Sequence, residues 1–399
     1  MTRLLTLTIT LMWIVTLSTR HVAAEEHAAP IEAARASTNA ATTAKSALFS
    51  DAKSWRSFRG DEANTGMSSA KLADKLVAAW RVETAGPVKS SAAIVGDTAY
   101  IGSDDQKLYA IDIATGDVRW TFKAVGPIEA APLVVAGVVY FGCVDGFVYA
   151  VDATTGQQQW RFATDGKVLG ACNWFQQAGA LRIIVGSYDF NLYCLDAKTG
   201  DKLWSYTSDN YINGSPAVSA GRIVFGGCDS MLHVLDAATG ERTASINLES
   251  YIAGSAAIRD GVAYLGHYGN AVEAVDITTS KPIWSYRDRE FAFFSSPAVT
   301  ENRVIIGGRD RRLHAIDRKT GDTLWQFRTR GQIDSSPVIV GDKVVFGSAD
   351  GKVYMVRVAD GVEVWQYELG DGVTSTPAIV DGLMIIGGED GLVYAFRNE

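Results

Sequence analysis

The sequence predicts an all-β fold: an eight-bladed β-propeller of four-stranded antiparallel blades, closed by an N-terminal strand near Trp80. Three observations support this fold. One motif recurs roughly every 40 residues, each repeat contains four short apolar runs separated by turn residues, and no stretch keeps a 3.6-residue apolar period. Units of about this length with four strands are typical of propeller blades, whereas α-solenoids need helical periodicity.

The recurring motif has the form A-x-D-x-x-T-G-x-x-x-W. Its clearest copies are AIDIATGDVRW at residues 110–120 and AVDATTGQQQW at residues 150–160. We expect each tryptophan to dock between neighbouring blades, where a buried indole contributes about 3–5 kcal/mol. The motif places Trp80, Trp120, Trp160, Trp204, Ala244, Trp284, Trp325 and Trp365 in one register, with an insertion in the third unit.

The first unit shows the expected order of strands within a blade. An inner strand over residues 90–96 is followed by a second strand over 98–103, a third over 107–112 and an outermost strand over 118–122. One such blade cannot bury both of its faces, so neighbouring blades must stack and the ring must close.

The two ends of the chain supply one blade between them. The last unit provides three strands within residues 375–398 and ends at Glu399 without its tryptophan strand. The missing strand is LVAAWRVE at residues 76–83, so its pairing with the C-terminus would close the ring. Deletion of either end should therefore destabilise the whole propeller.

Other repeated residues are expected to be structural. Small residues begin every inner strand because eight strands converge on one axis. The motif aspartates precede Thr-Gly turns and can accept backbone N–H bonds; they are Asp112, Asp152, Asp196, Asp236, Asp276 and Asp317. A second set fits the hairpin turn between the second and third strands and comprises Asp105, Asp145, Asp189, Asp229, Asp310, Asp350 and Asp390.

The N-terminus predicts export. Residues 1–24 have a basic start, an apolar run and small residues before a cleavage point after Ala24, which is typical of a signal peptide. Residues 25–54 predict a disordered linker and residues 55–399 the propeller. No later stretch is long and apolar enough for a membrane span. We expect a soluble monomer in the periplasm or outside the cell.

Charge and cysteine content exclude some functions. The net charge of −8 argues against binding to nucleic acid, which needs a positive field. In an oxidising compartment the four cysteines allow three disulfide pairings, but they also fit as small buried groups. They are Cys143, Cys172, Cys194 and Cys228.

The tryptophan motif, repeated around a ring of eight blades, resembles that of the quinoprotein dehydrogenase-like superfamily. The resemblance covers about residues 55–399, including the opening segment WRSFRGDEANTG at 55–66. It implies one of two branches: pyrroloquinoline-quinone (PQQ) dehydrogenases or non-enzymatic propellers that resemble the outer-membrane assembly protein BamB.

The resemblance to the dehydrogenases implies two adjacent disulfide-linked cysteines and Ca²⁺ ligands beside a catalytic aspartate. No two cysteines are adjacent in this chain, and a C-x-x-C-H haem motif is absent. The polar residues expected near the axis are scattered one per blade: Lys89, Glu129, Asn213, Asp334 and Thr374. The BamB-like branch therefore fits better, and we predict no catalytic residues, cofactor or metal.

A candidate binding surface lies on the face that carries the blade-to-blade connections and the turns between second and third strands. Arginine and aromatic residues are enriched in interface hot spots, and both gather near the sixth blade. The arginines are Arg287, Arg289, Arg309, Arg311, Arg312, Arg328 and Arg330; the aromatics include Tyr211, Tyr251, Tyr268 and Phe291. We predict a protein partner with an acidic or extended segment.

Three alternative interpretations fit the same sequence. The arginines could be neutralised by Asp288, Glu290, Asp310 and Asp334, with phenylalanines such as Phe293 and Phe294 filling the space between blades. A PQQ-binding oxidoreductase is a second possibility. A glycan-binding propeller is a third, favoured by Trp174 and Phe175 in the third blade if these aromatics are exposed rather than part of an elongated hairpin.

Overall fold

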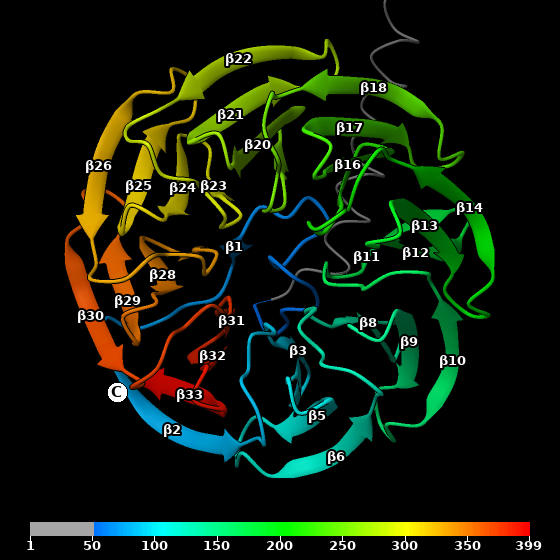
Figure 1. The fold of residues 1–399 in the computed structure, drawn as a ribbon. Helices are drawn as coiled ribbons and strands as arrows, with labels where there is room; N and C mark the ends of the chain where they lie inside the picture. The colour runs from blue at the N-terminus through cyan, green and yellow to red at the C-terminus, as the bar shows by residue number, and fades with distance from the viewer. Residues whose placement is uncertain (1–51) are drawn as a thin grey trace, which may run out of the picture. The chain divides into compact units, whose positions relative to one another are not determined.

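The computed structural model describes residues 52–399, and the secondary structure in this range consists of strands β1–β33. The predicted signal peptide and all of the predicted linker before Ala52 lie outside the described residues. In the described range there is no helix long and apolar enough to cross a membrane. Figure 1 shows the sheets arranged around a central axis, so the predicted eight-bladed β-propeller is confirmed.

Within each of the first four blades the strands run from the axis outward in chain order. Blade 1 contains β3 (Ala93–Val95), β4 (Thr98–Gly102), β5 (Lys107–Asp112) and β6 (Val118–Lys123). Blade 2 contains β7 (Leu133–Val135), β8 (Val138–Gly142), β9 (Phe147–Asp152) and β10 (Gln158–Ala163). Blade 3 contains β11 (Asn173–Gln177), β12 (Ala180–Gly186), β13 (Asn191–Asp196) and β14 (Lys202–Thr207). Blade 4 contains β15 (Ala217–Ser219), β16 (Arg222–Gly226), β17 (Met231–Asp236) and β18 (Arg242–Asn247).

The remaining blades follow the same order, with additions from the N-terminus in the last two. Blade 5 contains β19 (Ala257–Arg259), β20 (Val262–His267), β21 (Ala271–Asp276) and β22 (Lys281–Tyr286). Blade 6 contains β23 (Ala298–Val299), β24 (Arg303–Gly308), β25 (Arg312–Asp317) and β26 (Thr323–Arg328). Blade 7 contains β27 (Val338–Val340), β28 (Lys343–Gly347), β29 (Lys352–Arg357) and β30 (Glu363–Glu368), and blade 8 contains β31 (Ala378–Val380), β32 (Leu383–Gly387) and β33 (Leu392–Asn398).

The ring closes as predicted. Strand β2 (Leu76–Glu83) pairs antiparallel with β33, and Trp80 lies opposite Ala395 in the register. Blade 8 is thereby completed by a strand from the other end of the chain, and Figure 1 shows the blue strand β2 beside the red strand β33.

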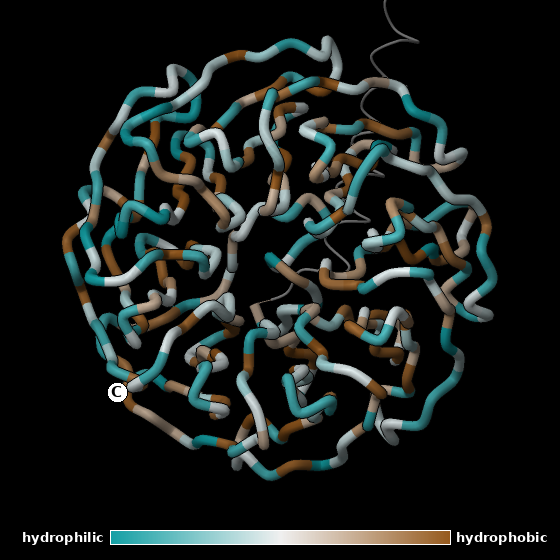
Figure 2. Tube along the Cα trace, viewed as in Figure 1, coloured by the Kyte–Doolittle hydropathy of each residue, from teal (hydrophilic) through white to brown (hydrophobic). Residues whose placement is uncertain are grey.

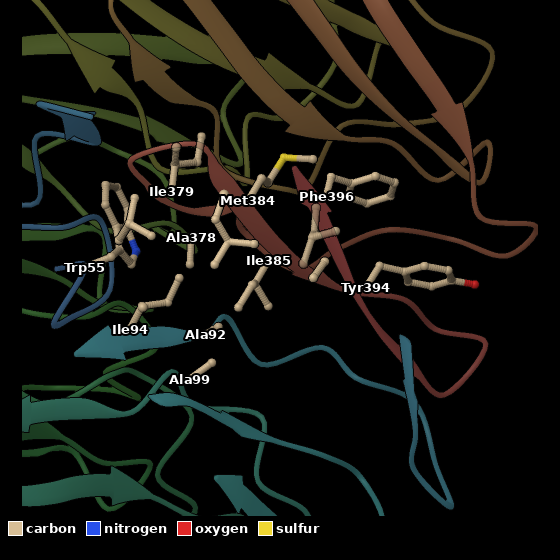
Figure 3. Close-up of a cluster of buried hydrophobic side chains, with 14 of the residues drawn as sticks. Trp55, Ala92, Ile94, Ala99, Ala378, Ile379, Met384, Ile385, Tyr394 and Phe396 are labelled. Carbon is tan, nitrogen blue, oxygen red and sulfur yellow. The ribbon is translucent and has the colours of Figure 1, made fainter. Parts of the chain in front are cut away.

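The hydrophobic core lies between the blades rather than in one central body. Figure 2 shows brown, hydrophobic residues within the blades and many teal residues in the loops. One cluster joins blades 8 and 1, where Ile94 and Ile385 are completely buried. Figure 3 shows these side chains together with Trp55, which comes from the segment before the first blade.

The motif tryptophans dock between blades, as predicted. The Trp120 indole N–H donates to the carbonyl of Ala153 in the next blade over 3.2 Å. The same type of bond is made by Trp80, Trp160, Trp284, Trp325 and Trp365. The indole N–H of Trp204 has no partner among the described residues. A glycine in the turn of the next blade packs against each of six indoles, for example Gly156 against Trp120.

Two glycines of blade 2 form a matched pair that tests this docking. Gly156 has a φ of +70°, and a Cβ there would lie 2.6 Å from the Trp120 ring; Gly137 has a φ of +77° and no atom within 4 Å of a Cβ. We expect Gly137→Ala to cost about 1–2 kcal/mol from backbone strain alone. Gly156→Ala should cost about 1–3 kcal/mol more because of overpacking. Urea denaturation checks this, and equal costs would contradict tight docking.

The motif aspartates stabilise their turns, as predicted. Asp276 accepts backbone N–H bonds from Thr278 and Thr279, and Asp317 accepts them from Lys319 and Thr320. The backbone N–H of Thr279 holds the pKa of Asp276 below its usual value, and that of Thr320 does the same for Asp317.

These lowered pKa values predict a loss of stability in acid. A carboxylate whose pKa is lower in the folded chain contributes its full stabilisation above the unfolded pKa and loses it as the pH falls through the folded pKa. We therefore expect Tm to fall below about pH 4. Asp276→Asn combined with Asp317→Asn should make Tm less dependent on pH in this range. If Tm changes with pH to the same extent in the double variant and the parent chain, Asp276 and Asp317 do not cause the loss of stability in acid.

The small residues at the start of the inner strands also link the blades. The hydroxyl oxygen of Ser255 accepts the backbone N–H of Ser215 from the preceding blade over 2.7 Å, and Ser296 accepts that of Ser255 over 2.9 Å. Ser91 does the same for Thr376 across the closure of the ring. The predicted reason, lack of space, is therefore incomplete, because the serines also hold neighbouring blades together.

The segment from Ala52 to Ser68, here called the axial segment, occupies the centre of the ring. Its role was not predicted from the sequence. It forms a hydrogen bond with each blade through Ile94, Val134, Asn173, Val218, Ile258, Val299, Ile339 and Asp381. Its last two residues form strand β1 (Met67–Ser68), which pairs in parallel with β27. Figure 1 shows this part of the chain in blue near the axis.

Candidate functional site

The blade-to-blade connections and the turns between second and third strands share one face of the ring, as predicted. In blade 1 the backbone N–H of Asp104 in the turn donates to the carbonyl of Pro87 in the connection over 2.9 Å. Blade 5 repeats this bond with Tyr268 and Tyr251. We call this surface the loop face, and it brings together the residues that vary from blade to blade.

A cavity of about 190 Å³ lies at the centre of the loop face, and all eight blades line it. Phe58 of the axial segment also contributes to its lining. The five polar residues expected near the axis all line this cavity, which we call the mouth: Lys89, Glu129, Asn213, Asp334 and Thr374.

The charged residues of the mouth are paired. The Lys89 ammonium group lies 2.7 Å from Asp104 and 3.2 Å from Glu129, and these ion pairs raise the pKa of Lys89. The Thr374 hydroxyl donates to Glu389 over 3.0 Å. The mouth therefore presents donors and acceptors side by side rather than a single sign of charge.

The structure divides the predicted arginines into paired and unpaired members. Arg309 donates twice to Asp334, over 3.0 and 2.7 Å, and its guanidinium lies 3.6 Å from the centre of the Phe294 ring. Arg287 donates to the carbonyl of Gly269 over 2.8 Å. Arg309 is thus neutralised by Asp334, and Arg287 is held by a backbone carbonyl within the protein.

Three of the predicted arginines stay available. Arg311, Arg328 and Arg330 are exposed, and their side chains form no hydrogen bond or ion pair with the residues that the structure describes. Arg312 and Arg328 lie directly opposite each other on β25 and β26. Arg312 donates to Gln326 and lies 3.8 Å from Asp310, so the positive patch of blade 6 consists of Arg311, Arg328 and Arg330.

The predicted aromatic residues lie on the loop face of neighbouring blades. Tyr251, Tyr268 and Tyr211 are 53%, 47% and 43% exposed, and Phe291 is also exposed. Their neighbours Phe293 and Phe294 differ: Phe293 is buried in the core between blades 5 and 6, whereas Phe294 is partly exposed. Tyr211 stacks on Tyr188, Tyr251 lies next to Tyr268, and Phe293 fills the space between blades, as the alternative interpretation predicts.

Trp174 and Phe175 do not form an exposed glycan platform, and that prediction is wrong for these residues. Trp174 is only 6% exposed, and Phe175 packs against the core of blades 3 and 4. The insertion in the third unit lengthens the hairpin of β11 and β12, in which Asn173 and Trp174 are buried, so the alternative of an elongated hairpin is correct.

The aspartates between second and third strands do more than form a turn, which corrects the simple hairpin explanation. In five blades a tyrosine four residues later donates its hydroxyl to the aspartate, as Tyr149 does to Asp145 over 2.8 Å. Blades 4 and 6 have histidine instead: His233 contacts Asp229 over 2.8 Å and His314 contacts Asp310 over 3.1 Å. In the sequence, this interaction is visible as a tyrosine or histidine four residues after each of these aspartates.

One cluster has the composition of a metal site. Ligand atoms of Asp288, Asp310 and His314 lie within 4.8 Å of one another. The guanidinium groups of Arg289 and Arg312 lie 3.9 and 3.8 Å from a carboxylate oxygen of Asp310. Two cations already occupy the surroundings that a metal ion would need, so we interpret the cluster as an ion-pair network.

The four cysteines are free thiols. Cys143, Cys172 and Cys194 are buried, in agreement with small core residues, and burial raises the pKa of each thiol to about 12. Cys228 is partly exposed on the loop face, where the side chain of Asn213 donates to its sulfur over 3.1 Å.

The residues at the axis do not fit the quinone cofactor of the dehydrogenase branch. The mouth is smaller than the roughly 300 Å³ at which pockets for drug-sized ligands begin. The axial segment passes through the centre of the ring, and adjacent cysteines for stacking are absent from the sequence. In the described part of the chain, the centre of the ring therefore lacks both the space and the stacking residues for PQQ.

The fold and the docking motif define the chain as a PQQ-repeat β-propeller. A family model described as outer membrane protein assembly factor BamB matches residues 75–180, 177–286 and 228–399. The chain belongs to this family. No curated protein sequence gives a significant match.

Solved structures with similar folds include a BamB protein and two dehydrogenases. BamB from Moraxella catarrhalis is 20% identical, with a TM-score of 0.69 over 81% of this chain and 100% of its own. A europium-containing methanol dehydrogenase is 13% identical, with a TM-score of 0.74 over 87% and 98%. Quinohemoprotein alcohol dehydrogenase from Comamonas testosteroni is 15% identical, with a TM-score of 0.75 over 86% and 80%. At these identities the likeness is one of fold.

Proposed function

We propose that this protein is an exported, non-enzymatic scaffold whose loop face binds a protein partner through an acidic or extended segment. The observation that carries the proposal is the positive patch of blade 6, where Arg311, Arg328 and Arg330 have no internal partner among the described residues. Membership in the BamB family supports a scaffold role, and the signal predicted over residues 1–24 supports export.

The patch suits an acidic segment for two physical reasons. Arginine binds carboxylates with paired, charge-assisted hydrogen bonds, and unpaired guanidinium groups keep this capacity free. The cross-strand neighbour of Arg328 is Arg312, which itself lies 3.8 Å from Asp310, so a carboxylate of the partner would be the first negative group to pair with Arg328. The exposed Phe291 and the neighbouring tyrosines extend the same face with hot-spot residue types.

Charge reversal at the patch tests the proposal. Arg311→Glu, Arg328→Glu and Arg330→Glu together should abolish binding of a polyglutamate peptide, measured by calorimetry, and the crosslinking of acidic partners in an envelope extract. The side chains of these residues form no hydrogen bond or ion pair among the described residues, and substitution leaves their backbone bonds in place, so the propeller should keep its Tm.

Three lysines on outer strands provide a control with the same change of charge. Lys123→Glu, Lys202→Glu and Lys281→Glu alter exposed residues of β6, β14 and β22, away from the patch. This triple variant should retain most of the binding. Equal loss in both triple variants would show that only net charge matters and would contradict a localised site.

A further inference from the structure

Beside the mouth lies a group of aromatic residues that the arginine patch does not explain. Here the aromatic arc denotes Tyr188, Tyr211, Tyr251, Tyr268 and Phe294, which lie on loops of blades 3 to 6. At the turn position where blades 1 and 8 have Asp104 and Glu389, blades 3 and 5 have Tyr188 and Tyr268. Phe294 also lines the mouth, and its ring centre lies 4.3 Å from that of Tyr268, so the arc begins at the edge of the cavity.

The rings of the arc are held in place by one another. Tyr188 and Tyr211 stack with ring centres 4.7 Å apart and planes 23° apart. Tyr268 lies 4.3 Å from Phe294 and 6.3 Å from Tyr251. Because these contacts already restrict the exposed rings, a ligand that covers them would lose little affinity to side-chain ordering.

The polar residues of the mouth offer hydrogen-bond groups of both kinds. Lys89 and Thr374 provide donors, Glu129 and Asp334 provide acceptors, and the amide of Asn213 is the fifth polar group in the lining. Most of these groups are already partnered, so the mouth carries local dipoles and ion pairs rather than one strong field.

This combination of groups selects the class of ligand. A cationic ligand would meet Lys89 and Arg309, and an anionic ligand would meet Glu129 and Asp334. Sugar hydroxyls both donate and accept, and the C–H face of a sugar ring packs well on an aromatic ring. We infer that the mouth and the aromatic arc bind a neutral oligosaccharide, with one terminal unit in the cavity and the following units along the arc.

The size of the cavity agrees with a single sugar ring. Its volume of about 190 Å³ lies below the roughly 300 Å³ of pockets for drug-sized ligands. A longer ligand must therefore extend over the surface, where Tyr251 and Tyr268 are about half exposed. The site uses residues other than Arg311, Arg328 and Arg330, so it goes beyond the proposed protein-binding function and can be tested separately.

Calorimetry with cellohexaose, chitohexaose and maltohexaose tests the inference on the full exported chain. We expect at least one of these hexasaccharides to bind, with an affinity that does not change between low and high salt because the ligand is neutral. Tyr251→Ala and Tyr268→Ala should each weaken binding about tenfold. Tyr251→Phe and Tyr268→Phe should keep most of it, since the ring faces remain.

Controls separate the site from general surface effects. Leu324→Ala removes an exposed apolar side chain from β26 and should leave sugar binding unchanged. The arginine triple variant should also bind the sugar normally. Failure of all three hexasaccharides to bind, or equal binding by the tyrosine-to-alanine variants with an unchanged Tm, would overturn the inference. Salt-sensitive binding of hexa-arginine in place of a sugar would also overturn it, in favour of a cationic ligand.

Discussion

Replacing Trp55 by alanine is expected to lower the free energy of unfolding by about 3–5 kcal/mol, the usual cost of removing a large buried aromatic side chain. Trp55 lies outside every blade, yet it is only 2% exposed and packs in the cluster between blades 8 and 1. Its backbone N–H and C=O pair with Ile94 over 2.8 and 2.7 Å. The loss should therefore loosen both the axial segment and the closure of the ring.

Urea denaturation followed by tryptophan fluorescence measures this effect. Phe291→Ala is a suitable control, because its side chain is about half exposed on the loop face and its loss should change stability by no more than about 0.5 kcal/mol. A cost below about 1 kcal/mol for Trp55→Ala would mean that the axial segment is not part of the folded core. Limited proteolysis should show in parallel that the axial segment is cut earlier in the variant.

The blades could be predicted from the sequence because their side chains repeat. Six of the motif tryptophans meet a glycine in the next blade, and six motif aspartates precede a turn, so the copies reinforce one another in a single chain. The same logic found the closing strand, since Trp80 continues the register. Periodic constraints of this kind are visible without coordinates.

The axial segment could not be predicted in the same way. It occurs once, and most of its bonds to the blades come from backbone carbonyls, such as that of Glu62 to Val218 and that of Ala63 to Ile258. Backbone hydrogen bonds can be formed by almost any residue type, so the amino-acid sequence does not reveal them. The sequence places Trp55 and Arg59 in the propeller domain, but nothing in their spacing indicates that they are buried at its axis.

The location of the candidate site could be predicted from the sequence, but the pairing of its charged residues could not. The loop face and the five polar residues of the mouth follow from strand order alone. Which arginines are neutralised depends on contacts across blades, as in the pair of Arg309 with Asp334. Such pairs are set by the geometry of side chains that no repeat constrains. The same limit explains why the sequence left open whether Trp174, which interrupts the repeat, is exposed or part of an elongated hairpin, whereas the structure buries it.

The exception to the docking motif supports the structural account of the glycines. Ala244 replaces the tryptophan of blade 4, and the turn of blade 5 that would receive it has Ser280 with a φ of +60° instead of glycine. At the six tryptophan–glycine contacts, a Cβ on the glycine would lie 2.5–2.9 Å from the indole. The two departures thus occur together, and Arg222 donates instead to Thr278 across this seam over 3.1 Å.

A double-mutant cycle at this seam should therefore show strong coupling. Ala244→Trp alone is expected to be destabilising, because the indole would clash with the Cβ of Ser280. Ser280→Gly alone should raise the free energy of unfolding by about 1 kcal/mol or less, because glycine relieves the backbone strain at this positive φ. Together they should make the chain more stable than either single variant, since the indole would then be buried, with a coupling energy of about 1–3 kcal/mol. Urea denaturation of the four chains measures this, and additive effects would show that the seam between blades 4 and 5 cannot accept the docking geometry of the other blades.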